Sequence, residues 1–182
     1  HNSGGLYICK NKAKAISDWQ NIKEKLEKSL KTNYYKLGRE WPYKNVPRKV
    51  LAEMLLETES EEISDYKFFC FDGKPEFLFV ATERQKLGVD VKFDFFDLDF
   101  NWLPIKQGHE NAAVKPSKPS NFEEMVKIVT TLSKGLRHAR IDLYNVNGKI
   151  YFGEITFFNH SGFLPFNPPE WDVKFGNMLK LP

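Results

Sequence analysis

Residues 140–156 read RIDLYNVNGKIYFGEIT, the segment that is most informative about the fold. Polar and apolar residues alternate on both sides of Asn147-Gly148, a dipeptide typical of tight β-turns. We therefore predict a β-hairpin with Asp142 on its first strand and Glu154 on its second. Two carboxylates brought together among Ile, Leu and Phe side chains are costly unless a positive charge lies between them. A hard divalent cation such as Mg²⁺ is the usual solution, because it takes oxygen ligands and accepts substrate phosphates.

The register of this hairpin decides whether the two carboxylates meet. A strict two-residue turn at 147–148 pairs Ile141 with Glu154 and puts Asp142 on the opposite face. A three-residue loop over 146–148 instead puts four polar residues on one face: Arg140, Asp142, Glu154 and Thr156. The metal site therefore requires the longer loop or a β-bulge. The alternative is a solvated strand face on which the arginine neutralises the carboxylates.

Composition and charge narrow the class of protein. Of 182 residues, 41% are hydrophobic and 28% are charged, which is typical of a single globular domain with an apolar core. The net charge of +3 is small, so we expect no nucleic-acid partner. Cys9 and Cys70 lie too far apart for a metal-binding motif, and we expect free, buried thiols in the reducing cytoplasm. No apolar run has the length of a membrane span.

The other segments predict an α+β fold with a mostly antiparallel sheet and flanking helices. Asp72-Gly73 indicates a second hairpin. We expect the remaining strands over residues 6–9, 50–56, 65–71, 75–81 and 91–96. Amphipathic helices are expected over about 18–30, capped by Ser17, and from Ser120 or Asn121 to about Leu136. The aromatic and proline-punctuated residues 33–48 read as an ordered loop.

Together these segments resemble the ATP-grasp superfamily, and specifically its TupA-like branch. The resemblance covers essentially the whole chain, residues 1–182, as one domain, and it rests on the order and spacing of short markers. These markers are HNSGG at 1–5, NYYKLGREWPY at 33–43, Ala52-Glu53, DYKFFCFDG at 65–73, RIDLY at 140–144, Gly153-Glu154, PEWD at 169–172 and LKLP at 179–182.

The resemblance implies that ATP is held between two α+β subdomains. Ser3, Gly4 and Gly5 would form the loop that closes over the phosphates, because glycines let backbone N–H groups approach phosphate oxygens. A hinge strand would contact the adenine edge through Glu53, Met54 and Leu55. Two basic residues complete this expectation: Lys67 would face phosphate, and Arg84 would meet phosphate or an acidic acceptor. The alternatives are an ordinary turn, an outward-facing Glu53 and solvated basic side chains.

The same resemblance assigns roles on the hairpin. Asp142 and Glu154 match the superfamily's metal-binding acids, and Thr156 stands where many members have Asn in a Glu-x-Asn pattern. The Thr156 hydroxyl or Asn159 would then complete the metal site. Arg140 would stabilise charge on the transferred phosphoryl group. The superfamily's phosphate-binding lysine lies on a strand before the glycine loop, so we expect more chain upstream and weak nucleotide binding by this piece alone.

The implied activity is ATP- and Mg²⁺-dependent ligation of a carboxylate to an amine through an acyl phosphate. The branch points to cell-surface polysaccharide assembly, with an acidic sugar or another carboxylate as one substrate and an amine as the other. Two alternatives come from other classes. One is a carbohydrate-binding or scaffold module, in which Trp41, Trp102 and Trp171 stack on sugars. The other is a kinase-like phosphotransferase acting on a sugar hydroxyl. ATP turnover separates the module from both enzymes, and dependence on an amine separates ligase from kinase.

Overall fold

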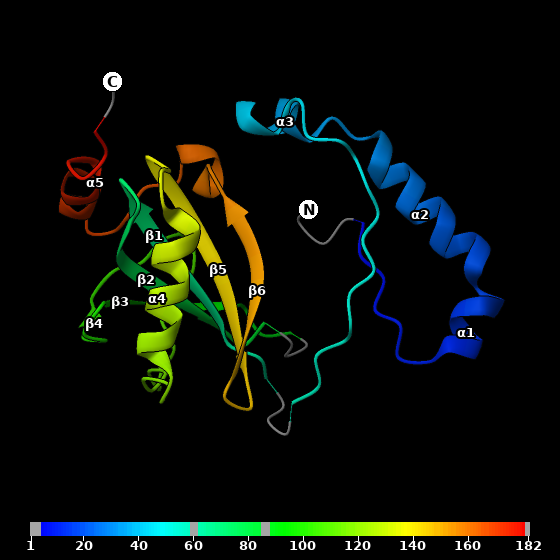
Figure 1. Ribbon diagram of the computed structural model, residues 1–182, viewed down its shortest axis with the longest axis horizontal. Coiled ribbons are helices and arrows are strands. Elements are labelled where there is room, and N and C mark those ends of the chain that lie inside the picture. Colours follow the sequence, from blue (N-terminus) through cyan, green and yellow to red (C-terminus); the bar gives the residue numbers. More distant parts are fainter. Residues whose placement is uncertain (1–4, 59–61, 85–87, 181–182) are drawn as a thin grey trace. The chain divides into compact units, whose positions relative to one another are not determined.

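The computed structural model describes residues 5–58, 62–84 and 88–180. The chain divides into two compact units, His1–Glu57 and Thr58–Pro182 (Figure 1). Among the described residues, no helix combines the length and the apolar character needed to cross a membrane.

In the described part of the first unit, residues 5–57, helices are joined by irregular chain and no strand forms. Its elements are α1 (Lys12–Ser17), α2 (Trp19–Lys31), α3 (Tyr34–Leu37) and the 3₁₀ helix η1 (Trp41–Tyr43). The helix expected over 18–30 is confirmed as α2, but Ser17 ends α1 rather than capping α2. Two short helices also form within the segment expected to be a loop, residues 33–48.

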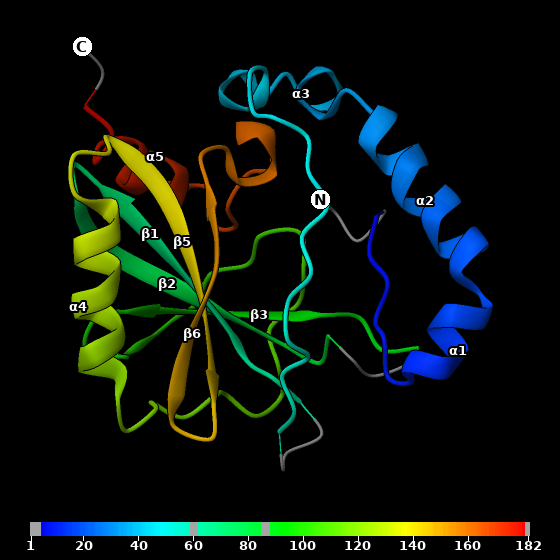
Figure 2. The same cartoon turned by 45° about the vertical axis from the view of Figure 1, so that its right-hand side comes forward.

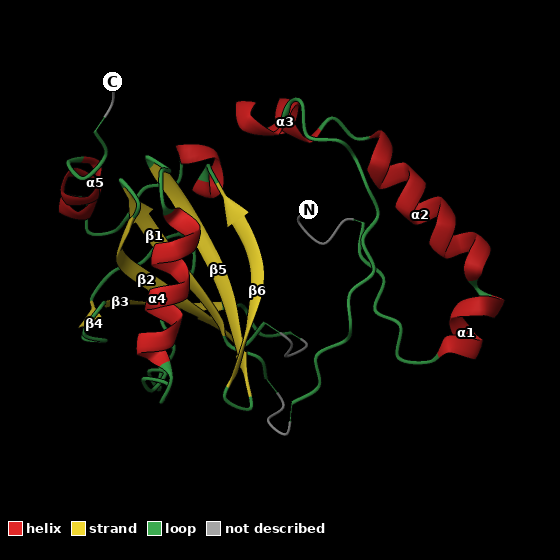
Figure 3. Ribbon diagram, viewed as in Figure 1, coloured by secondary structure: helices red, strands yellow, loops and turns green. Residues whose placement is uncertain are grey.

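Two strands expected in the first unit are wrong. Residues 6–9 and 50–56 have no β-pairing, and Figure 3 shows the second segment as irregular chain. Their sequences are apolar enough for strands, and Val50 and Leu51 are exposed. A strand also needs a neighbouring strand that satisfies its backbone groups. Pairing of that kind is a tertiary property, which a short apolar run does not predict.

The second unit is built on one antiparallel sheet. Its strands are β1 (Asp65–Phe71), β2 (Lys74–Thr82), β3 (Lys92–Asp97), β4 (Trp102–Leu103), β5 (His138–Val146) and β6 (Lys149–Thr156). Their order across the sheet is β4-β3-β2-β1-β5-β6. Helix α4 (Phe122–Ser133), the 3₁₀ helix η2 (Asn159–Gly162) and α5 (Glu170–Gly176) complete the unit. The predicted α+β class with an antiparallel sheet is therefore confirmed.

Tight turns close two of the hairpins as the sequence predicts. Asp72 and Gly73 have φ of 45° and 77°, and Asn147 and Gly148 have φ of 51° and 76°. Positive φ at both central residues is the geometry of a type I′ turn, whose twist matches that of paired strands. These two turns fix where β1 meets β2 and where β5 meets β6.

The sheet packs a different kind of core on each face. Helix α4 covers one face, where Phe122, Met125 and Val129 lie against buried residues of β1, β2 and β5 (Figure 2). The other face carries a phenylalanine cluster on β1, β2 and β3, to which Phe175 of α5 contributes. The Phe77 and Phe175 rings stack with their centroids 3.7 Å apart. This second face also carries the polar side chains of the candidate site.

Candidate functional site

A β-bulge brings the two hairpin carboxylates together. The register starts as a two-residue turn sets it, then shifts between Asp142 and Leu143, so that Asp142 lies opposite Glu154. Gly153 is the extra residue, and a Cβ added there would lie 3.0 Å from the Asp142 carbonyl oxygen. The three-residue loop is therefore wrong, and the bulge supplies the shift that a shared face requires.

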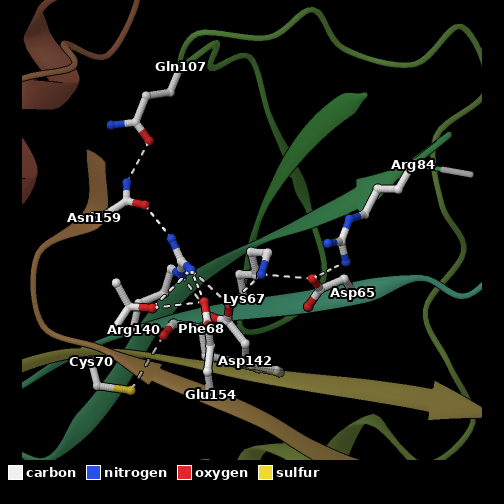
Figure 4. Close-up of polar contacts among 11 residues, drawn as sticks. Asp65, Lys67, Phe68, Cys70, Arg84, Gln107, Arg140, Asp142, Glu154 and Asn159 are labelled. Carbon is white, nitrogen blue, oxygen red and sulfur yellow. Dashed lines mark hydrogen bonds and ion pairs between the residues drawn. The ribbon is translucent and has the colours of Figure 1, made fainter. Parts of the chain in front are cut away.

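Arg140 occupies the centre of this site. Its Nε donates to Asp142 Oδ1 and its Nη2 to Asp142 Oδ2, both at 2.8 Å. Nη2 also lies 3.1 Å from Glu154 Oε1 and 3.1 Å from Thr156 Oγ1 (Figure 4). Burial acts to lower the Arg140 pKa, but the hydrogen bonds and charges of Asp142 and Glu154 outweigh it and raise that pKa. The guanidinium is therefore a permanent, well-oriented cation.

Lys67 adds a second cation on the same face. It lies directly opposite Asp142 in the register of β1 and β5, and its ammonium contacts Asp142 Oδ2. The same Nζ lies 2.8 Å from Asp65 Oδ2, and Arg84 Nη1 lies 2.5 Å from that oxygen. Burial raises the pKa of Asp65, and the charges of Lys67 and Arg84 oppose this shift.

These contacts form a continuous row in which charges of opposite sign alternate. We call it the charge row, and its members in order are Arg84, Asp65, Lys67, Asp142, Arg140 and Glu154. Asp65 and Asp142 have side chains that are only 1% exposed. Glu154 is 56% exposed and Arg84 is 40% exposed. The row therefore has a buried middle and two ends that solvent and ligands can reach.

An amide pair ties the segment after β6 to the row. Arg140 Nη1 donates to Asn159 of η2, and Asn159 Nδ2 donates to Gln107 Oε1 at 2.9 Å. Gln107 Nε2 then donates to the Leu164 carbonyl oxygen at 3.0 Å. Inside η2, His160 and Ser161 have φ of 47° and 57°, a left-handed conformation that non-glycine residues seldom adopt. The Arg140 guanidinium is thus held by Asn159 of η2 as well as by Asp142 of its own strand.

The other predicted nucleotide-binding residues belong to the first unit. Ser3 and Gly4 lie outside the described residues. Gly5 lies in a turn, where an added Cβ would come 2.3 Å from Ser29 Oγ. The predicted hinge strand is absent, because Glu53, Met54 and Leu55 are exposed in chain without β-pairing. The structure therefore groups Lys67, Arg84 and the hairpin residues, and it gives the hinge residues no strand.

Sequence reasoning missed Asp65 and Gln107. Asp65 precedes Lys67 by two residues on one strand, so strand periodicity places both on the same face. That signal was present in the sequence. Gln107 lies in a loop after β4, and its contact with Asn159 joins residues 52 apart in the chain. No local pattern predicts such a contact.

The donor set of the hairpin suits a magnesium ion that arrives with phosphates. Among the described residues, no group of three or more His, Cys, Asp and Glu side chains is placed to hold a metal. Mg²⁺ needs only one or two carboxylates when water and phosphate oxygens complete its shell. Asp142, Glu154 and the Thr156 hydroxyl supply hard oxygen donors, and the exposed Glu154 is open to such an ion. The Asn159 side-chain oxygen accepts from Arg140, as the oxygens of Asp142, Glu154 and Thr156 do, so Asn159 stays the alternative to Thr156 as a third ligand.

Comparison with known proteins assigns the family. Searches of curated proteins and of solved structures gave no match. The family model described as TupA-like ATPgrasp matches residues 1–180, which is nearly the whole chain. The matched residues include the charge row and the β5–β6 hairpin, which carries Arg140, Asp142 and Glu154. The chain therefore belongs to the TupA-like ATP-grasp family.

Proposed function

We propose that this protein is an ATP- and Mg²⁺-dependent ligase that joins a carboxylate to an amine through an acyl phosphate. Membership in the ATP-grasp family supports an ATP-dependent enzyme of ligase or kinase-like type. The charge row is the observation that carries the proposal. It holds the two cations Arg140 and Lys67 beside the carboxylates Asp142 and Glu154 on one sheet face. A phosphate chain with its metal requires both kinds of group.

The cations of the row would bind the phosphates. Arg140 is fixed by its paired contacts to Asp142 and by Asn159, so it needs no rearrangement to face a developing negative charge. Lys67 would add a second charge beside it. Asp142, Glu154 and Thr156 would hold Mg²⁺, which when bound offsets phosphate charge and helps to align the reacting groups. Arg84, at the exposed end of the row, would meet a phosphate or the acidic substrate.

The proposed chemistry has two steps. A carboxylate oxygen of the acceptor attacks the γ-phosphorus of ATP, the bond to the β,γ-bridging oxygen breaks, and ADP leaves. The amine nitrogen then attacks the carbonyl carbon of the acyl phosphate, phosphate leaves, and the nitrogen loses a proton to give the amide. The protein's part is to position the reactants and to stabilise charge.

We propose an acidic sugar as the carboxylate substrate, and the cytoplasm, where ATP is available, as the location. Cell-surface polysaccharide assembly would be the process served. This choice follows the TupA-like branch of the family, together with the exposed Arg84 at one end of the row. The second substrate would be an amine.

Trapping with hydroxylamine tests this function. Hydroxylamine converts an acyl phosphate into a stable hydroxamate, so the chain incubated with ATP, Mg²⁺ and acidic sugars should form a hydroxamate together with ADP. Glu154→Gln, which removes a ligand charge at similar volume, should lower the yield about a hundredfold. A phosphorylated sugar without hydroxamate would instead identify a kinase. Absence of any ATP-dependent product with acidic sugars would contradict an enzyme formed by residues 1–182 alone.

A further inference from the structure

Lys67 lies between two buried carboxylates that play different parts in the site. Its ammonium contacts Asp142 Oδ2 on one side and Asp65 Oδ2 on the other. Its own side chain is 12% exposed. Asp142 is a proposed metal ligand, and Asp65 has no part in the function proposed above. The ammonium therefore neutralises a carboxylate that a metal would need.

The oxygens of Asp142 are fully engaged by cations. Oδ1 accepts from Arg140 Nε, and Oδ2 accepts from Arg140 Nη2 and from Lys67. A divalent ion that approaches Asp142 must therefore displace positive charge. Arg140 is held in addition by Thr156 and Asn159, and its guanidinium is a rigid plane. Lys67 has a flexible stem and a second acceptor, so it is the cation free to move.

Asp65 is built to receive that ammonium. Its Oδ2 already holds Lys67 at 2.8 Å and Arg84 at 2.5 Å. Its Oδ1 is buried and has no hydrogen-bond partner among the described residues. A buried carboxylate oxygen without a donor is costly, and a shift of Lys67 away from Asp142 would supply one. The same shift would free Asp142 Oδ2 for another ligand.

We propose that Lys67 is a movable counter-ion of Asp142, and that Asp65 is the positioning residue that receives its ammonium when a metal ion takes Asp142. This inference rests on the proposed function, because it takes Asp142 as a metal ligand. It follows that a metal alone meets a neutralised site and binds weakly. Without nucleotide, Asp65 alone can draw Lys67 away from Asp142; bound phosphates would draw the ammonium further, so nucleotide and metal each strengthen the binding of the other.

Titration with Mn²⁺ in the absence of nucleotide tests this proposal on the full chain, with bound metal measured by electron paramagnetic resonance. Lys67→Gln removes the competing charge and should tighten Mn²⁺ binding about tenfold. Asp65→Asn removes the second acceptor, holds Lys67 on Asp142, and should weaken Mn²⁺ binding about threefold. In the double variant the effect of Asp65→Asn should vanish, because Asp65 acts only through Lys67.

Folding and charge controls keep the outcome clear. In Lys67→Gln both acids keep an arginine partner, Arg84 for Asp65 and Arg140 for Asp142, so this variant remains informative even if Asp65→Asn fails to fold. Lys118→Gln removes a lysine from an exposed ion pair and should leave Mn²⁺ binding unchanged.

The effect of Lys67→Gln on ATP binding should be opposite to its effect on Mn²⁺ binding. Lys67→Gln should weaken ATP binding while it tightens Mn²⁺ binding, which a merely structural role would not produce. Mn²⁺ binding that is unchanged, weakened or undetectable in Lys67→Gln would overturn the counter-ion proposal. Failure of every variant to bind ATP would contradict the proposed function alone, because the titrations with Mn²⁺ contain no nucleotide.

Discussion

Arg140 carries one guanidinium and donates to side chains on four residues: Asp142, Glu154, Thr156 and Asn159. This single side chain joins β5, β6 and η2. Its partner Asp142 is 1% exposed, so the two charges were taken out of water together. Pairs of this kind stabilise little by themselves, but removal of one partner leaves a buried charge without compensation.

Arg140→Met should therefore lower the free energy of unfolding by about 3 kcal/mol, because among the described residues Asp142 would keep Lys67 as its one ion-pair partner. Urea denaturation followed by circular dichroism measures this change. The matched control is Arg137→Met, which removes an arginine that is 61% exposed and should cost less than about 1 kcal/mol. Equal losses in the two variants would contradict the structural role given to Arg140.

Cys70 offers a second test at the scale of one residue. The thiol is fully buried, and burial raises its pKa to about 12. At pH 8 roughly one Cys70 in ten thousand is then a thiolate, the form that reacts. We expect one fast-reacting thiol per native chain with Ellman's reagent, from the exposed Cys9, and two after denaturation. Fast labelling that persists in Cys9→Ser would show that Cys70 is accessible.

The shared face of Arg140, Asp142 and Glu154 can be predicted from the sequence, because it depends on contacts within one hairpin. Asp142, Glu154 and Arg140 stand on a hairpin whose turn residues are adjacent in the chain, so their shared face depends on one register. The sequence predicts a buried Cys9, but Cys9 is exposed, because its segment forms no strand. Burial of a single thiol depends on packing partners far away in the sequence.

The β5–β6 hairpin positions the residues of the site. Its bulge lies at Gly153, where a side chain would crowd the Asp142 carbonyl oxygen. The dipeptide Asn147-Gly148 predicts the turn, but a two-residue turn alone pairs Ile141 with Glu154. The bulge corrects this by one residue. The sequence offered glycine as a hint, since a glycine within a strand often marks a bulge or a close backbone approach. It did not fix where the shift would fall.

Gly153→Ala should disturb this element, because the new Cβ would lie 3.0 Å from the Asp142 carbonyl oxygen and 3.2 Å from the Tyr144 ring. We expect the free energy of unfolding to fall by about 1–2 kcal/mol. We also expect ATP turnover to fall, because β6 would move Glu154 away from Asp142. Gly176→Ala is the control, since its Cβ would meet no atom within 4 Å. Turnover by Gly153→Ala equal to that of the control would count against the bulge as the device that positions Glu154.

Other segments show why some of the predicted strands form and others do not. Residues 65–71, 75–81 and 91–96 form strands as expected, because alternating or apolar runs there meet clear turn signals and neighbouring strands. Residues 50–56 are similarly apolar and pair with nothing. The family resemblance implies a hinge strand, and Glu53, Met54 and Leu55 do not form it.

At the scale of the whole molecule, the two units differ in how they are stabilised. Both apolar clusters and the charge row belong to the unit Thr58–Pro182. Among the described residues of the first unit, only Ile22 and Glu40 are buried. Apolar burial is the main source of folding free energy, so stability should reside in the second unit.

Residues 58–182 expressed alone should therefore unfold in one cooperative thermal transition, whereas residues 1–57 alone should melt gradually. Circular dichroism on each fragment measures this difference. A sharp transition in the first fragment would show that it has a cooperative fold of its own, and the absence of a transition in the second would show that residues 58–182 need the first unit in order to fold.

If the charge row binds ATP together with Mg²⁺, as we propose, calorimetric titration of residues 1–182 with ATP should show it. We predict that Mg²⁺ tightens ATP binding at least about tenfold, and that Glu154→Gln loses this tightening. Since Glu154 is 56% exposed, the variant should keep its melting temperature. ATP binding that is independent of Mg²⁺, or equally strengthened by Mg²⁺ in Glu154→Gln, would show that the charge row does not bind ATP through a metal ion.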